Sequence, residues 1–234
     1  MRPRSRAVLC LSMLLSALGC ETQRVTVPVI PPLLPIPKPA VFWREPFDTL
    51  DPTRWREVTV RRRTQYEAIT LDGRRCLRAQ SHDGASILMS AVRFDPHAYA
   101  RLSWAWRVDR LVDGEALDRK DGSDAAARVY VYFETPGLPW QKHSLDYVWS
   151  ATLPVGTVLD SAYAQTSKII VVESGADSPG QWRTETRNLV DDYTRCFGEA
   201  PPDVVAIGVM SDTDTIGGDA LAYFDELRVN RSTP

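Results

Sequence analysis

Two segments of the sequence alternate apolar residues with residues that can bind a ligand. Residues 102–108 read LSWAWRV, and residues 127–133 read ARVYVYF. Because successive side chains of a strand point to opposite faces, we expect Arg107, Arg128 and Tyr130 on the face turned away from the core. Aromatic rings stack on the C–H faces of sugars, and an arginine fork binds a carboxylate through two parallel hydrogen bonds. This face is the candidate ligand site, with Asp124 and Trp149 expected at its rim.

The two arginines leave two interpretations open. If their strands are neighbours, Arg107 and Arg128 lie close together, and two like charges at short range repel unless they are neutralised. An acidic sugar or another carboxylated ligand would neutralise them. Acidic residues of the chain, such as Asp124 or Glu134, would do so equally well, as an internal network that braces the sheet.

The position of each tryptophan within its alternating segment predicts whether its side chain lies in the core or on the candidate binding face. Trp104 and Trp106 alternate in phase with the apolar residues of their segment, so we expect them in the core. Tyr147 and Trp149 stand two residues apart and are expected to join the binding face.

A short acidic motif suggests a metal. The segment 211–215 reads SDTDT and follows a strand that is expected to be buried. Asp212 and Asp214 can present oxygens to one hard cation such as calcium. The alternative is that they cap a turn through hydrogen bonds to their own backbone. No other cofactor is indicated.

Motifs for catalysis are missing from the sequence. It contains three histidines, His82, His97 and His143, and neither a GxSxG nucleophile elbow nor an HExxH motif. His143 is expected to be exposed in a loop. The acid-x-acid-x-x-acid strand of laminarinase-type enzymes is also absent. These features favour a binding module; a glycoside-hydrolase-like enzyme and a structural protein-interaction domain remain the alternatives.

The N-terminus carries a targeting signal. Arginines at positions 2, 4 and 6 precede an apolar run over residues 7–15 and a small-residue exit, which is the pattern of a secretory signal peptide. We expect the signal over residues 1–19. Cys20 directly after it resembles the lipobox of bacterial lipoproteins, which implies an acylated cysteine inserted in a lipid bilayer. With Glu21 next, the resemblance favours the outer membrane of the bacterial cell envelope.

Composition excludes some partners. The 234 residues carry a formal net charge of −2, and loss of the signal arginines makes the remainder more acidic. Nucleic-acid binders need a basic excess, so we expect no nucleic-acid partner. Apart from Cys20 and a cysteine in the signal, the chain has Cys76 and Cys196. In an oxidising compartment these two can form a disulfide, or they can remain separate buried thiols.

The remaining chain divides into a linker and one domain. Residues 27–39 read VPVIPPLLPIPKP, and such a proline density disfavours helix and sheet, so residues 20–40 are expected to be a tether. Its apolar residues could alternatively pack on the domain. Residues 41–231 contain many short β-rich runs separated by turn signals, and only residues 187–197 have a helical apolar stripe. This pattern predicts an all-β, antiparallel β-sandwich with one short helix.

The two ends of this region resemble a known architecture. Residues 42–48 (FWREPFD) resemble the opening strand of lectin-like and glucanase-like jelly rolls, and residues 223–229 (YFDELRV) resemble the closing strand beside it. Between them, SWAWRV, ARVYV, YVW, PVGT, IVVESG and SDTD follow in an order similar to that of bacterial domain-of-unknown-function family 3047. The resemblance implies a concanavalin-like or galactose-binding-like jelly roll with carbohydrate as the nearest precedent for a ligand, and it implies no known activity.

Overall fold

The computed structural model describes residues 39–138, 141–175 and 180–231. The predicted signal peptide 1–19, the lipidation residue Cys20 and most of the predicted tether 20–40 lie outside these ranges. By internal contacts the chain divides into Met1–Pro37 and Lys38–Pro234. Within the described ranges, none of the helices has the length and apolar character needed to cross a bilayer.

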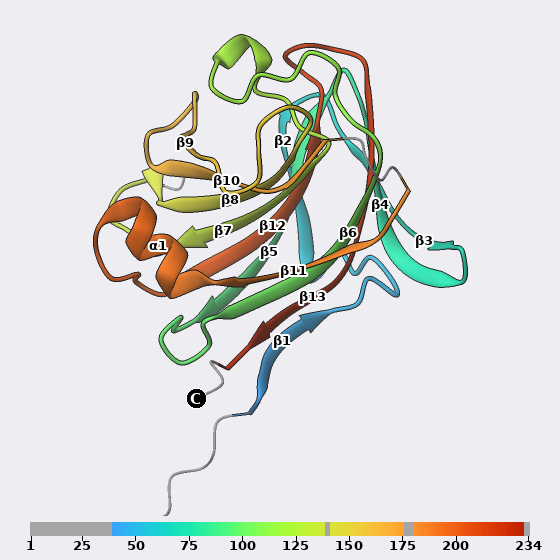
Figure 1. Ribbon diagram of the computed structural model, residues 1–234. Helices are drawn as coiled ribbons and strands as arrows, with labels where there is room; N and C mark the ends of the chain where they lie inside the picture. The colour runs from blue at the N-terminus through green and yellow to red at the C-terminus, as the bar shows by residue number, and fades with distance from the viewer. Residues whose placement is uncertain (1–38, 139–140, 176–179, 232–234) are drawn as a thin grey trace, which may run out of the picture. The chain divides into compact units, whose positions relative to one another are not determined.

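The described chain forms two β-sheets that pack face to face (Figure 1). In order of position, the six-stranded sheet contains β11 (Arg183–Asn188), β6 (Arg101–Arg110), β13 (Asp219–Asn230), β4 (Arg74–His82) and β3 (Gln65–Leu71), and β1 (Val41–Glu45) pairs with β13. The seven-stranded sheet contains β2 (Trp55–Arg61), β5 (Ala85–Phe94), β12 (Val204–Asp212), β7 (Ala127–Phe133), β8 (Ser144–Ser150), β10 (Ser167–Ser174) and β9 (Val158–Asp160). The predicted β-sandwich is confirmed.

The first and last strands are neighbours, as the sequence predicts. Trp43 of β1 pairs antiparallel with Val229 of β13. One feature differs from the expected antiparallel arrangement, because β8 and β10 run parallel. A parallel pair needs a crossover between its strands, and residues 151–166 provide it and carry β9.

The described ranges contain one α-helix, which packs against the core through Leu189 and Tyr193. The helix α1 covers Leu189–Phe197, so it begins later than the predicted 187–197 because Arg187 and Asn188 belong to β11. The Asn188 side chain accepts hydrogen bonds from the backbone N–H groups of Val190 and Asp191, and Gly198 ends the helix with a φ of 75°. A short 3₁₀ helix covers Lys120–Gly122.

The core lies between the sheets and is rich in aromatic rings. Trp104 and Trp106 are fully buried there, as predicted. The expectation that Tyr147 and Trp149 join the binding face is wrong. Both side chains point into the core, where Tyr147 lies 5.3 Å from Trp104 and Trp149 lies 5.7 Å from Trp106 between ring centroids. Their strand alternates as predicted, but its phase is opposite, since Leu145, Tyr147 and Trp149 together face inward.

The two cysteines of the described chain correspond to the alternative of separate thiols. Cys76 and Cys196 are both free thiols. Leu77 and Ala79 of β4 face the core, so Cys76 points to the outer side of the six-stranded sheet, whereas Cys196 lies on α1 and packs toward the core. Burial raises the pKa of the Cys76 thiol to about 11, which keeps it protonated and unreactive.

Candidate functional site

The outer face of the seven-stranded sheet contains a cavity of about 300 Å³. Its floor comes from strands β2, β5, β12, β7, β8 and β10, and residues 161–166 between β9 and β10 form one wall. The residues that line the cavity include Val60, Ile87, Arg128, Tyr130, Tyr132, Lys142, Ser144, Asp146, Tyr163, Ser167, Met210, Asp212 and Asp214. Sequence reasoning found Arg128, Tyr130, Asp212 and Asp214, and the structure brings these four together.

Arg128 is buried beneath this cavity and is fully engaged by the protein. Its Nε donates to Asp212 Oδ1 at 2.9 Å, Nη1 donates to Asp146 Oδ2 at 2.6 Å, and Nη2 donates to the carbonyl of Ser123 at 2.8 Å. Burial acts to lower the pKa of Arg128, but the two carboxylates outweigh it and hold the pKa well above its ordinary value. Of the two interpretations left open by the sequence, the internal network describes this residue.

Two tyrosines form the aromatic part of the cavity. Tyr130 and Tyr132 project from β7 on the same side, with ring centroids 5.7 Å apart and an angle of 20° between the rings. Both are partly buried, and burial raises their pKa values far above the physiological range. They therefore present neutral, flat surfaces to whatever enters the cavity.

Beside the tyrosines lies a carboxylate with an unused acceptor. Asp146 pairs with Tyr130 across β7 and β8. Its Oδ2 binds Arg128, whereas its Oδ1 is buried and has no hydrogen-bond partner in the described part of the chain. A buried acceptor without a partner costs about 1–3 kcal/mol. Sequence reasoning missed Asp146, although the alternation in residues 144–150 places it opposite Tyr147 and Trp149.

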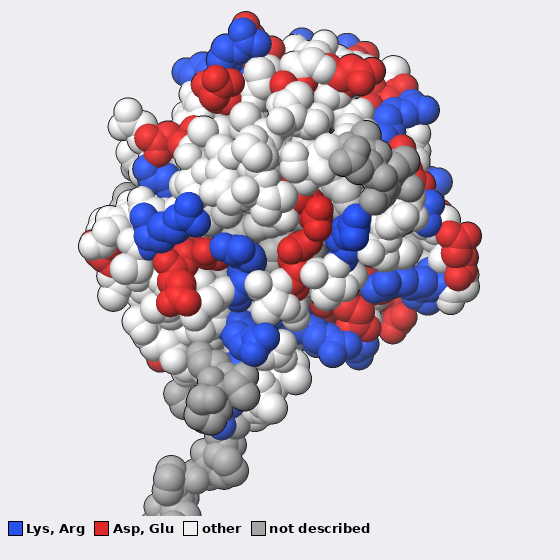
Figure 2. Space-filling model, in the orientation of Figure 1, with Lys and Arg blue, Asp and Glu red and all other residues white. Residues whose placement is uncertain are grey.

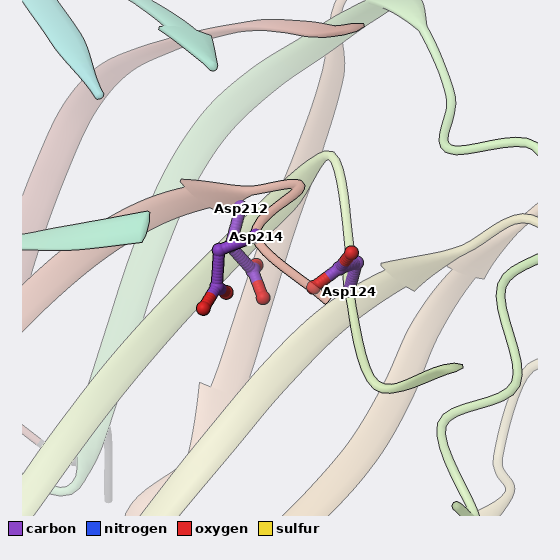
Figure 3. Close-up of side chains that lie close together, drawn as sticks. All are labelled: Asp124, Asp212 and Asp214. Atoms are coloured by element: carbon purple, nitrogen blue, oxygen red, sulfur yellow. The ribbon is translucent and has the colours of Figure 1, made fainter. Parts of the chain in front are cut away.

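Three aspartates gather at the end of the cavity (Figure 3). Asp212 and Asp214 come from the end of β12 and the residues after it, and Asp124 comes from the segment before β7; one oxygen of each lies within 4.8 Å of the others. Asp124, expected at the rim, is fully buried and accepts hydrogen bonds from the backbone N–H groups of Thr215 and Ile216. Burial, with Asp124 nearby and against the effect of Arg128, raises the pKa of Asp212 to about 7.

This acidic group is the place where a cation could bind. Carboxylate oxygens are the ligands that calcium takes, but Asp212 already binds Arg128 and Asp124 already binds backbone N–H groups. The backbone N–H groups of the turn after β12 are bound by Asp124, and not by Asp212 or Asp214 as the turn-capping alternative expected. The calcium site stays a prediction.

Tyr163 spans the cavity wall, and sequence reasoning did not find it. Its hydroxyl donates to the carbonyl of Lys120 at 2.9 Å and lies 3.0 Å from Thr215 Oγ1. These bonds connect the loop between β9 and β10 to two segments that are distant in sequence. The site is thus enclosed by long-range contacts that no local pattern could indicate.

Arg107, the remaining candidate, lies on the other side of the molecule. It belongs to β6, between β11 and β13 of the six-stranded sheet, whereas Arg128 belongs to the opposite sheet. Their strands are therefore not neighbours, and the condition under which the two arginines would lie close together is not met. Arg107 binds both oxygens of Asp109 and lies 5.6 Å from the ring centroid of Tyr223. Basic and acidic side chains are intermixed over the face seen in Figure 2, including the region of the six-stranded sheet.

His143 is also placed differently from expectation. It is partly buried, its ring stacks on Phe197 at 4.2 Å between centroids, and Nδ1 lies 2.7 Å from the Tyr193 hydroxyl. Burial lowers the pKa of His143, so this ring serves the packing of α1 in its neutral form.

Comparison with known proteins decides the family. Residues 53–228 match the sequence profile of a family described as a protein of unknown function, DUF3047. The chain belongs to this family. The membership that the sequence resemblance predicted is thereby confirmed. No curated protein matches the chain.

Solved structures similar to this DUF3047 protein include a xylan-binding domain from Paenibacillus barcinonensis, with 9% identity, a TM-score of 0.40, and coverage of 83% of this chain and 96% of that one. A family 11 carbohydrate-binding module from Clostridium thermocellum has 8% identity, a TM-score of 0.39, and coverage of 80% and 94%. A xyloglucanase domain from Sinorhizobium fredii has 8% identity, a TM-score of 0.43, and coverage of 78% and 96%. Likenesses this remote assign neither a ligand nor an activity to this chain.

Proposed function

We propose that this DUF3047 protein binds a neutral carbohydrate in the cavity on the outer face of its seven-stranded sheet. The observation that carries the proposal is the pairing of the stacked Tyr130 and Tyr132 with the unpartnered Asp146 Oδ1 in one cavity. A sugar ring can stack on the tyrosines while one of its hydroxyls donates to Asp146. Ligand cavities of this kind are largely apolar with a few convergent polar groups.

The charges of the cavity favour a neutral sugar over a carboxylated one. Arg128 and Lys142 face Asp146, Asp212 and Asp214 in the lining, and Arg128 already binds two of these acids. Lys142 likewise binds Glu134 and the carbonyl of Thr135. A ligand carboxylate would therefore compete with existing ion pairs for both cations, whereas hydroxyl groups would not.

A glycan array tests the proposal. The protein should be the full chain carrying Cys20→Ala, and the array should contain neutral and carboxylated oligosaccharides. We expect saturable binding of neutral members and a loss of at least about tenfold in affinity for Tyr130→Ala, as for other central aromatic contacts. Tyr223→Ala, which removes a buried tyrosine from the outer face of the other sheet, is the control and should bind normally. Binding that is equal in both variants would place the site elsewhere.

Hydrolysis is the second candidate function, and one observation favours it. Asp212 has a pKa of about 7 and lies in the same cavity as Asp146, whose pKa is also raised by burial. Glycoside hydrolases use two carboxyl groups, of which one holds its proton at neutral pH. Shortened oligosaccharides in the array wells, lost in Asp212→Asn, would establish catalysis.

Placement in the cell completes the proposal. Acylation of Cys20 would anchor the protein in the bacterial cell envelope, on the outer membrane, because several buried acyl chains hold a protein durably on a bilayer. Metabolic labelling with a fatty acid tests this. Label should enter the wild type and be absent from Cys20→Ala; label in the variant would exclude lipidation at this residue.

A further inference from the structure

The lining of the cavity changes character from one side to the other. Toward β8 and β10 it is polar, with Ser144, Asp146 and Ser167. Toward β2, β5 and β12 the lining contains Val60, Ile87 and Met210, and Asp212 and Asp214 lie at the end of β12. The two kinds of surface meet at Tyr130 in the middle, so a ligand that fills the cavity meets hydroxyl-binding groups at one end and hydrocarbon at the other.

The apolar side continues beyond the cavity along the same face. Val58 pairs with Ile87, and Ile87 pairs with Met210, so these three side chains form one row across three strands. Met89 lies on the same side two residues along β5, where it borders a second hollow. This hollow is lined by Val58 and Trp43 and also by Arg54 and Arg56. The apolar strip is defined here as Val58, Val60, Ile87, Met89 and Met210.

The outer edge of the strip is open to solvent. Exposure of its valine side chains to water is unfavourable. Val58 is 47% exposed and Val60 is 61% exposed, and both lie on β2 at the edge of the seven-stranded sheet. Contiguous apolar side chains on the surface of a protein mark a contact with another molecule. What distinguishes this strip is its continuity with a cavity whose other end is built for hydroxyl groups.

Gly208 lies between the two surfaces and allows Ile87 of the strip to pack directly against the backbone of β12. It pairs with Met89 on one side and Tyr130 on the other, so a side chain here would stand between the strip and the aromatic pair. A β-carbon at this position would lie 2.9 Å from Ile87 Cγ2, closer than real contacts allow. The Ile87 side chain therefore lies over the backbone of Gly208, between Met89 and Tyr130.

We propose that the natural ligand is an amphiphile, a neutral sugar that carries a hydrocarbon group, such as the saccharide head of a glycolipid. The sugar occupies the Tyr130–Asp146 side of the cavity, and the hydrocarbon lies along the apolar strip toward Val58 and Met89. This inference rests on the proposed function and names the class of sugar-bearing ligand that this site takes.

A series of alkyl glycosides tests the inference. Methyl, butyl, hexyl and octyl β-glucosides and β-galactosides should be titrated calorimetrically into the full chain carrying Cys20→Ala, each below the concentration at which it forms micelles. Each buried methylene contributes about 0.8 kcal/mol, so affinity should rise by up to about fourfold per added carbon while the strip is being covered. The gain in affinity per added carbon therefore measures the contribution of the strip separately from that of the sugar site.

Two sets of variants assign the effect to residues. Val58→Thr combined with Val60→Thr keeps the shape of the side chains and adds two hydroxyls, so the gain per carbon should fall while methyl glycosides bind as before. Val155→Thr changes a valine of similar exposure, 60%, outside the strip and should leave the series unchanged. Thermal melts of all variants check that the fold is kept.

The possible outcomes separate the two proposals. If methyl and octyl glycosides bind with equal affinity, and Tyr130→Ala weakens both, the amphiphile is wrong and the sugar site stands. A chain-length gain that persists in the Val58→Thr, Val60→Thr variant also overturns the role of the strip. If octyl glycosides bind through the strip but Tyr130→Ala has no effect on their affinity, the proposed sugar site is wrong. The proposal of an amphiphilic ligand, which rests on that site, is then wrong too. Absence of binding by every glycoside overturns both.

Discussion

An arginine on one outer face of the sandwich has different surroundings from an arginine on the other outer face. On the seven-stranded sheet, Arg128 is buried and its nitrogens donate to two buried aspartates and a carbonyl. On the six-stranded sheet, Arg107 binds Asp109 and the largely exposed Asp72. Both arginines project away from the core of their own strand, so alternation alone treats them as equivalent. The two sheets differ in which parts of the chain cover their outer faces.

Over the seven-stranded sheet, loops add a second, smaller core. Leu117 and Ala125, from the segment between β6 and β7, pack on Val148, Ile169 and Val171 of β8 and β10. These loops shield Arg128 from solvent, and the cavity lies at their edge. Where such a cover exists, a polar outward residue must find protein partners, because an unpaired buried charge is costly.

Over the six-stranded sheet, long side chains provide the cover instead. Arg74 stacks on Trp182 at 4.0 Å from the ring centroid and binds Asp225, and Arg107 lies over Tyr223. The guanidinium groups of Arg74 and Arg107 lie over aromatic rings and cover part of this surface. The comparison teaches that covering loops produce a cavity with a site, whereas covering side chains produce a closed surface.

Removal of each arginine should give the largest difference between the faces. Arg128→Ala leaves Asp146 and Asp212 buried without their cation, so the free energy of unfolding should fall by about 3–5 kcal/mol. Arg107→Ala should cost about 1 kcal/mol, because its partners remain in contact with solvent. Denaturant unfolding of both variants at neutral pH measures the two values. Equal losses would show that the loops over the seven-stranded sheet do not isolate Arg128 from water.

The titration of Asp212 gives a smaller effect with a defined sign. Its folded pKa of about 7 lies above the ordinary value, so folding favours the protonated form, and this stability is complete below about pH 4 and is lost as pH rises through 7. Asp212→Asn resembles the protonated residue. We expect the variant to match the wild type near pH 5 and to gain on the order of 1–2 kcal/mol relative to it at pH 8.

Chemical denaturation at the two pH values checks this expectation. If Asp212→Asn is destabilised more at pH 8 than at pH 5, the ionised Asp212–Arg128 pair is the favoured state, and the electrostatic description of the cavity must be reversed.

Calcium should give the smallest effect of the three. Because Arg128 and backbone N–H groups already serve Asp212 and Asp124, millimolar calcium should raise the melting temperature by less than about 2 °C, equivalent to at most about 1 kcal/mol for a chain of this size. A larger rise that is reversed by chelator and absent in Asp214→Asn would establish a metal site and would separate this face further from the other.

Alternation within single strands determined much of the fold. The inward set of β6, with Trp104 and Trp106, and the pairing of β1 with β13 follow from local patterns and a family resemblance. The same reasoning failed for Trp149, because a strand in which both faces are covered shows no clear polar side. All seven residues of β8 are buried, so its phase could not be recognised from amphipathicity.

The sequence by itself determined that this chain forms a β-sandwich of the DUF3047 family, and that Arg128 and Tyr130 point away from the core, since both follow from period-two patterning and motif order. Only the tertiary structure decided which outward residues form a site. The order of strands separated Arg107 from Arg128, and the loop containing Tyr163 enclosed Asp146 beside Tyr130. Strand order and loop closure depend on contacts between residues far apart in the chain, and a local pattern carries no information about which distant residues will be neighbours.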